Sequence, residues 1–157
     1  MAFIKCVLIL AFIVILFQDI KERMVTWFLF PLVAICCSTI HYNETLPELF
    51  LSSVLFNLIL VSVFVIIIYL YSRFKLLVSF NKAIGLGDIC LFYAMSLAFS
   101  SVTFLVLFIS SLIFSLVIHS ALKKEASTVP LAGYISLFLV MVYTSHWTGL
   151  INSIYTI

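Results

Sequence analysis

Charged side chains are scarce in this 157-residue sequence: 9% of its residues are Asp, Glu, Lys or Arg, whereas 66% are hydrophobic. Soluble domains average about 25% charged and roughly 45–50% apolar residues. A water-soluble fold of this size therefore lacks the polar side chains needed to cover its surface. Intrinsic disorder is also excluded, because ample apolar surface is available to offset the entropy of ordering.

Glycine, proline and paired cysteines are rare as well. Four Gly and three Pro exclude collagen-like and low-complexity chains. The four cysteines form no C-x-x-C pair, which argues against zinc ribbons and thioredoxin-like redox sites. The net charge of +2 gives no indication of a nucleic-acid partner. With no glycine-rich nucleotide loop and only scattered histidines, we expect neither a cofactor nor a metal.

Long apolar runs dominate what remains, and the mean hydropathy is +1.36. A membrane-spanning helix needs about 20 predominantly apolar residues, and these runs do not alternate in polarity as barrel strands do. We predict an all-α, polytopic protein of the lipid bilayer, with residues 1–157 forming a single integral-membrane domain. The first run is interpreted as a retained helix, because no small-x-small cleavage site follows it. The predicted spans are 2–18, 26–42, 49–71, 88–100, 102–121 and 130–147.

The stretch from Ile89 to Ile118 decides the topology, because it is long for one crossing and short for two. Ser100 and Ser101 provide the candidate turn. With two crossings, seven basic residues share one side and Lys5 lies alone on the other. The seven are Lys21, Arg23, Arg73, Lys75, Lys82, Lys123 and Lys124. Positive charge concentrates in cytoplasmic loops, so we predict about six transmembrane helices with both termini extracytoplasmic.

Two aspartates lie at the same predicted cytoplasmic boundary. Asp19 ends the first predicted helix and Asp88 begins the fourth. Taken singly, Asp19 is typical of a solvated interfacial residue, and Asp88 of a helix N-cap behind a flexible turn at Gly85 and Gly87. Taken together, they fit a catalytic pair for peptide hydrolysis. One ionised carboxylate would take a proton from water while the other, protonated, donates a hydrogen bond to the scissile carbonyl.

Helix dipoles suggest which aspartate plays which part. A helix start favours negative charge and a helix end disfavours it. This favours Asp88 as the base and Asp19 as the acid, provided that the first helix ends at Asp19. Two further polar residues in apolar runs have structural interpretations: Asn57 is expected to hydrogen-bond a neighbouring helix, and His119 to pack between helices or support the aspartates.

Three motifs resemble those of a known family. G-L-G-D at 85–88 matches the GxGD signature of membrane aspartyl proteases. D-I-K-E-R-M-V at 19–25 is similar to the first-aspartate motif of type IV prepilin peptidases, and T-V-P-L-A-G at 128–133 to the proline-containing start of that family's last helix. The order and spacing of the three motifs cover essentially the whole chain. Thr26-Trp27 stands where the family has proline-asparagine, Cys90 where it has lysine, and Ala132-Gly133 where it has a second glycine-proline element.

The resemblance implies a leader peptidase of the cell membrane. Such an enzyme cleaves short, basic leader peptides from type IV prepilin-like precursors at the cytoplasmic face. The chain looks like a short form, without the cysteine-bearing insertion of bifunctional members, which implies peptidase activity without methyltransferase activity. The residues so assigned are Asp19 and Asp88 as the catalytic pair, Gly85 and Gly87 as the active-site turn, and Arg23 and Pro130 as supporting residues.

Two other interpretations remain open at this stage. Presenilin-like proteases also use GxGD, but they have more helices and a tyrosine before the first aspartate, where this chain has Gln18. A non-enzymatic scaffold or assembly factor of a pilus or secretion system would use the aspartates as helix caps.

Overall fold

The computed structural model describes residues 1–76, 84–122, 129–150 and 154–155. Lys82, Lys123 and Lys124 of the predicted basic loops, and Thr128 of the third motif, lie outside them. Across the described residues every regular element is helical, which confirms the all-α prediction. The elements are α1 (Ala2–Glu22), α2 (Leu29–Glu44), α3 (Pro47–Tyr71), the π-helix η1 (Ser72–Leu76), α5 (Leu86–Ser96), α6 (Ser101–Ala121) and α7 (Leu131–Trp147).

Local sequence explains where these helices begin and end. Pro47 occupies the first turn of α3 with Glu48 beside it, where a missing N–H and a negative charge are both favourable. The predicted turn between the fourth and fifth helices is confirmed: α5 ends at Ser96, and Ser100 adopts an extended conformation immediately before α6. The Ser100 hydroxyl donates to Oγ1 of Thr103, 3.1 Å away.

Two helix boundaries differ from the predicted ranges in ways that affect the site. The first helix continues past Asp19 to Glu22 and ends at Arg23 in the left-handed region, with φ of 55°. The fourth helix has 11 residues, Leu86–Ser96, in place of the predicted 88–100. Eleven residues rise about 16 Å, roughly half of a 30 Å hydrocarbon core. Length alone therefore does not make α5 a complete crossing.

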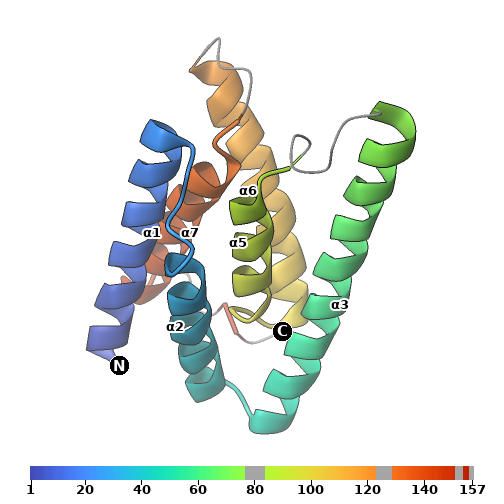
Figure 1. The fold of residues 1–157 in the computed structure, drawn as a ribbon. Helices are drawn as coiled ribbons and strands as arrows, with labels where there is room; N and C mark the ends of the chain where they lie inside the picture. The colour runs from blue at the N-terminus through green and yellow to red at the C-terminus, as the bar shows by residue number, and fades with distance from the viewer. Residues whose placement is uncertain (77–83, 123–128, 151–153, 156–157) are drawn as a thin grey trace.

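The helices form one bundle in which chain neighbours run in opposite directions (Figure 1). α7 contacts both α1 and α6, α2 contacts α1 and α5, and α3 contacts α5 and α6. The N-terminal part of α1 lies beside the end of α7, where Lys5 Nζ is 5.1 Å from the ring centroid of Trp147. Tyr155 stacks on His41 near the end of α2. The start of α1 and Tyr155 therefore lie at the end of the bundle opposite Asp19.

The outside of the bundle is strongly apolar. Phe17, Ile59 and Leu116 are each more than 60% exposed, on three different helices. Within the described residues, three stretches are long and apolar enough to cross a membrane: Ala2–Glu22, Pro47–Phe74 and Ser101–Ala121. Since large exposed apolar surfaces are unfavourable in water, this exterior is consistent with a helical membrane protein.

Asn57 fixes the position of α5 within the bundle. It is fully buried on α3, and its Nδ2 donates to the carbonyls of Ser96 at 3.1 Å and Phe99 at 2.9 Å. These carbonyls lie at the end of α5, where the helix leaves them without backbone partners. The predicted interhelical bond of Asn57 is therefore confirmed. Because α5 is a short, rigid helix, fixing this end also positions its other end, which carries Asp88.

Candidate active site at the start of α7

The first turn of α7 presents two free backbone N–H groups to the aspartates. A helix leaves its first amides without intrahelical partners. Here the amide of Leu131 donates to the Val129 carbonyl at 2.9 Å, and that of Tyr134 to the Pro130 carbonyl at 3.2 Å. The two amides between them, those of Ala132 and Gly133, point to carboxylates instead. Pro130, predicted to support the site, is the residue that begins this turn.

Consecutive amides hold the two aspartates. The N–H of Ala132 donates to Oδ1 of Asp88 at 2.8 Å, and the N–H of Gly133 donates to Oδ2 of Asp19 at 2.6 Å. The two carboxyls are close enough to interact electrostatically. The predicted convergence of Asp19 and Asp88 at one end of the bundle is therefore observed. The bridging part of α7 was not predicted.

Asp19 is buried at the contact between α1 and α7, with 9% of its surface exposed. The space beside it is so small that a Cβ on Gly133 would lie 3.2 Å from Asp19 Oδ2 and 3.4 Å from the Leu16 carbonyl oxygen. Glycine at this position therefore permits the close approach of α1. Arg23 follows α1 directly, and its positive charge interacts with the Asp19 carboxyl.

The dipole argument for acid and base roles does not hold in this geometry. It required α1 to end at Asp19, but the helix continues to Glu22. Moreover, both carboxylates accept hydrogen bonds from the N-terminal turn of α7, so both experience the favourable end of the same helix dipole. The dipole of α7 consequently does not distinguish Asp19 from Asp88.

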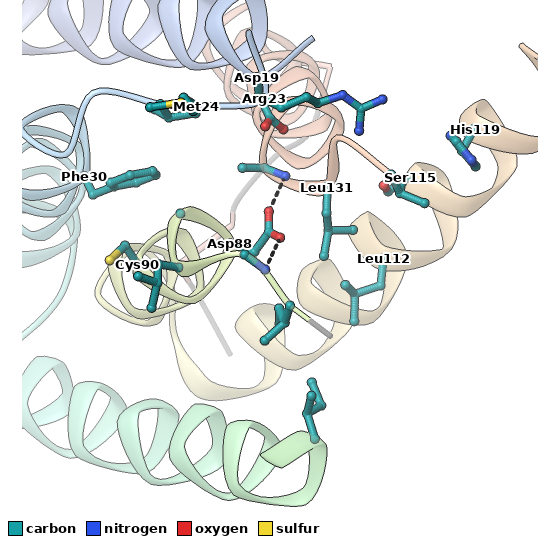
Figure 2. Close-up of a pocket in the computed structure, with 18 of the residues that line it drawn as sticks. Asp19, Arg23, Met24, Phe30, Asp88, Cys90, Leu112, Ser115, His119 and Leu131 are labelled. Atoms are coloured by element: carbon teal, nitrogen blue, oxygen red, sulfur yellow. Dashed lines mark hydrogen bonds between the residues drawn. The ribbon is translucent and has the colours of Figure 1, made fainter. Parts of the chain in front are cut away.

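Asp88 belongs to the first turn of α5 and is partly exposed to the neighbouring cleft. Its second oxygen, Oδ2, accepts from the Gly85 amide at 3.2 Å, so the same carboxylate caps α5 and contacts α7 (Figure 2). Neither Gly85 nor Gly87 adopts a positive φ. Their importance is steric: an added Cβ would lie 3.0 Å from Asp88 Oδ2 at Gly85 and 3.2 Å from Cζ of Phe30 at Gly87.

A cleft of about 1160 Å³ opens beside the aspartates. This volume exceeds the roughly 300–1,000 Å³ of small-molecule pockets and suits a larger ligand such as a peptide. Most of its lining is apolar, and among the described residues the charged ones that line it are Asp19, Asp88 and Arg23. Figure 2 shows Met24 and Phe30 on one side of the aspartates and Ser115 and His119 of α6 on the other.

The histidines divide between the two ends of the bundle. His119 lines the cleft, whereas His41 is buried at the opposite end, where its Nδ1 lies 3.2 Å from the Leu97 carbonyl oxygen. His146 also lies at that end, against Tyr155. Over the described part of the chain, no group of three His, Cys, Asp or Glu residues could hold a metal ion.

Sequence reasoning missed three contributors: Ala132, Gly133 and Ser115. The first two act through backbone amides and carry no side-chain signal, although the proline before them marked a helix start whose amides need partners. Ser115 was hidden among the serines of an apolar run. The resulting arrangement places two carboxylates together at the lining of one cleft. Such a pair can share one proton, because two adjacent negative charges are unfavourable.

Comparison of the chain with protein-family models, with curated proteins and with solved structures finds no match.

Proposed function

We propose that this protein is an intramembrane aspartyl endopeptidase that removes short, basic leader peptides from type IV prepilin-like precursors. The observation that carries this proposal is the binding of Asp19 and Asp88 by consecutive amides of α7 at the edge of a peptide-sized cleft. The three sequence motifs supply the substrate class, and the geometry supplies a reason for each of them. The first two motifs carry the acids and the third carries the amides.

In the proposed reaction the pair holds one proton in the resting state. The ionised carboxylate takes a proton from a water molecule, and the hydroxyl attacks the scissile carbonyl carbon while the protonated carboxyl donates a hydrogen bond to the carbonyl oxygen. Collapse of the tetrahedral intermediate breaks the C–N bond, and a proton passes to the leaving amine. The Ala132 and Gly133 amides keep the carboxylates in place throughout and limit their rotation.

The proposed setting is the cell membrane, with six crossings, both termini outside and the aspartates at the cytoplasmic face. The start of α1 and Tyr155 lie opposite the aspartate pair, which suits this orientation. The basic residues described next to the site, Lys21 and Arg23, suit a cytoplasmic boundary. We further propose that the short form acts as a peptidase alone, so that the purified chain transfers no methyl group to the new N-terminus.

One observation favours the alternative of a non-enzymatic scaffold. Asp88 accepts the Gly85 amide at 3.2 Å, as an aspartate that only caps α5 would do. However, a single carboxylate suffices to cap a helix start, whereas two are bound at the start of α7. The second negative charge adds repulsion that capping does not require. The proposed hydrolysis, by contrast, requires two carboxyl groups.

Substitution of each aspartate by asparagine tests the proposal. Asn keeps an oxygen that accepts the α7 amide, so Asp19→Asn and Asp88→Asn are expected to insert and fold but to cleave no precursor. Glu22→Gln, which removes an exposed carboxylate one turn from Asp19, is the matched control and is expected to cleave normally. The assay incubates each protein in liposomes with a precursor that has a basic leader, a glycine and a hydrophobic segment. Full cleavage by either aspartate variant refutes the catalytic pair.

A further inference from the structure

α6 contributes two polar side chains to a wall of the cleft that is otherwise apolar. Ser115 and His119 are four residues apart, so they lie on one face of the helix, and both line the cleft. Leu112 and Leu116 are the other lining residues of α6. The Ser115 side chain is fully buried. Neither Ser115 Oγ nor His119 Nδ1 has a hydrogen-bond partner among the described residues.

A neighbouring serine on α6 differs from Ser115 in this respect. Ser111 lies one turn earlier on α6 and is equally buried, yet its hydroxyl donates to the Phe108 carbonyl at 2.8 Å. Ser111 does not line the cleft. Buried polar groups in folded proteins are almost always hydrogen-bonded, and a buried group without a partner in its own chain points to water or a ligand. On α6, the buried side-chain atoms without a partner among the described residues are Ser115 Oγ and His119 Nδ1, and both residues line the cleft.

We propose that Ser115 and His119 hydrogen-bond the main chain of the substrate in an extended conformation beside the scissile bond. This inference rests on the proposed function, because it assumes that a peptide occupies the cleft. A peptide needs such partners there: its N–H and C=O groups would otherwise lie unpaired against leucine side chains. A hydroxyl and a neutral imidazole can each donate and accept, so they suit a backbone that offers both kinds of group.

The spacing of the two residues matches an extended chain. Four residues along a helix rise about 6 Å. An extended strand presents groups to the same side at every second residue, which is about 6.6–6.8 Å. Ser115 and His119 can therefore bind main-chain groups two residues apart. Arg23 also lines this cleft, and its positive charge disfavours the basic leader side chains as the ligand of the α6 pair.

The test combines enzyme variants with esters placed in the substrate. A synthetic precursor segment is made with single esters in place of successive amides around the scissile bond, since an ester lacks the N–H donor. Each is cleaved in liposomes by the full chain and by Ser115→Ala, His119→Phe and His119→Gln. Ser111→Ala, which removes an equally buried hydroxyl that does not line the cleft, is the matched control.

We expect Ser115→Ala and His119→Phe each to raise KM about three- to ten-fold with little change in kcat, because a contact made equally in the ground and transition states affects binding alone. His119→Gln should restore much of the loss, and Ser111→Ala should resemble the wild type. With the wild type, an ester at one or two positions should raise KM. In the variant that lacks the side chain bound by that N–H, Ser115→Ala or His119→Phe, the same ester should no longer raise KM.

Three results would overturn the inference. If the wild type cleaves but the α6 variants leave KM unchanged, the pair does not bind substrate. If ester effects simply add to those of the variants at every position, the contact is not with the main-chain N–H. If the wild type cleaves no precursor and Asp88→Asn behaves identically, the proposed function fails and this inference fails with it.

Discussion

The close approach of α1 to Gly133 predicts that Gly133→Ala destabilises the protein. Without that contact, the same substitution would be expected to stabilise α7. Replacement of Gly133 by alanine would place a Cβ 3.2 Å from Asp19 Oδ2 and 3.3 Å from Asp19 Cβ. The Asp19 carboxyl can rotate, but Asp19 Cβ is attached directly to the backbone of α1 and cannot, and the Leu16 carbonyl oxygen at 3.4 Å is in ordinary contact. To accept the methyl group, α1 must therefore move from α7 by a few tenths of an ångström.

Two opposing effects set the expected magnitude. Alanine is favoured over glycine in a helix by up to about 1 kcal/mol, so Gly133→Ala would stabilise an uncrowded helix. Overpacking of a close contact costs about 1–3 kcal/mol. We expect the packing cost to prevail, with a net loss of up to about 2 kcal/mol in the free energy of unfolding. Because a 1 Å misplacement can reduce catalysis about 100-fold, a shift of a few tenths of an ångström should reduce cleavage by roughly four-fold.

Thermal unfolding in detergent and cleavage in liposomes measure the two effects separately. Ala132→Gly is the matched control: it keeps the N–H that Asp88 accepts and adds no atom beside Asp19. This control should lose about 0.5–1 kcal/mol of stability and retain near-normal cleavage. If Gly133→Ala is instead as stable as the wild type, or more so, and cleaves at the same rate, the tight contact between α1 and α7 is incorrect.

Three other predictions follow from separate parts of the structure. Gly85→Ala should reduce cleavage more than Gly87→Ala, because the new Cβ meets the α5 carboxylate in the first variant and the movable end of a phenylalanine ring in the second; equal rates would argue against a steric role. Asn57→Leu should lower the free energy of unfolding by about 1–3 kcal/mol, measured in detergent, since it leaves carbonyls at the end of α5 unpaired; an unchanged value contradicts that bond. A small maleimide should label exposed Cys90 in the folded protein but reach buried Cys37 only after denaturation; failure to label Cys90 before denaturation would refute the open cleft.

Much of the helical fold could be predicted from the sequence, because apolar runs and their polar interruptions are local signals. The turn at Ser100 followed from length and from the distribution of basic residues, and the structure places it where α5 and α6 separate. The length of α5 could not be predicted in this way. Residues Leu97 to Phe99 are as apolar as the residues of the neighbouring helices. Their departure from helical structure depends on tertiary contacts, including the Asn57 bond to the Phe99 carbonyl.

The candidate site was predictable where side chains carry its chemistry and unpredictable where the backbone does. Asp19 and Asp88 were recognisable because carboxylates near hydrocarbon are costly. Their meeting point was not, since the sequence does not state which helix lies between α1 and α5. The parts played by Gly133 and Ser115 depend on a neighbouring backbone and on a cleft, respectively, and both arise only when the bundle assembles.

Binding by two successive backbone amides of α7 sets the spacing between Asp19 and Asp88. Ala132 and Gly133 are joined by one peptide unit, whose dimensions are fixed by covalent geometry. A tilt of α7 as a rigid body therefore carries both carboxyl groups with it and leaves their separation nearly constant. Sliding of α1 or α5 along α7, by contrast, breaks a whole hydrogen bond. The fold thus favours a state in which both aspartates are bound to α7 or a state in which one of them is released. Intermediate separations between the two carboxyls are poorly stabilised.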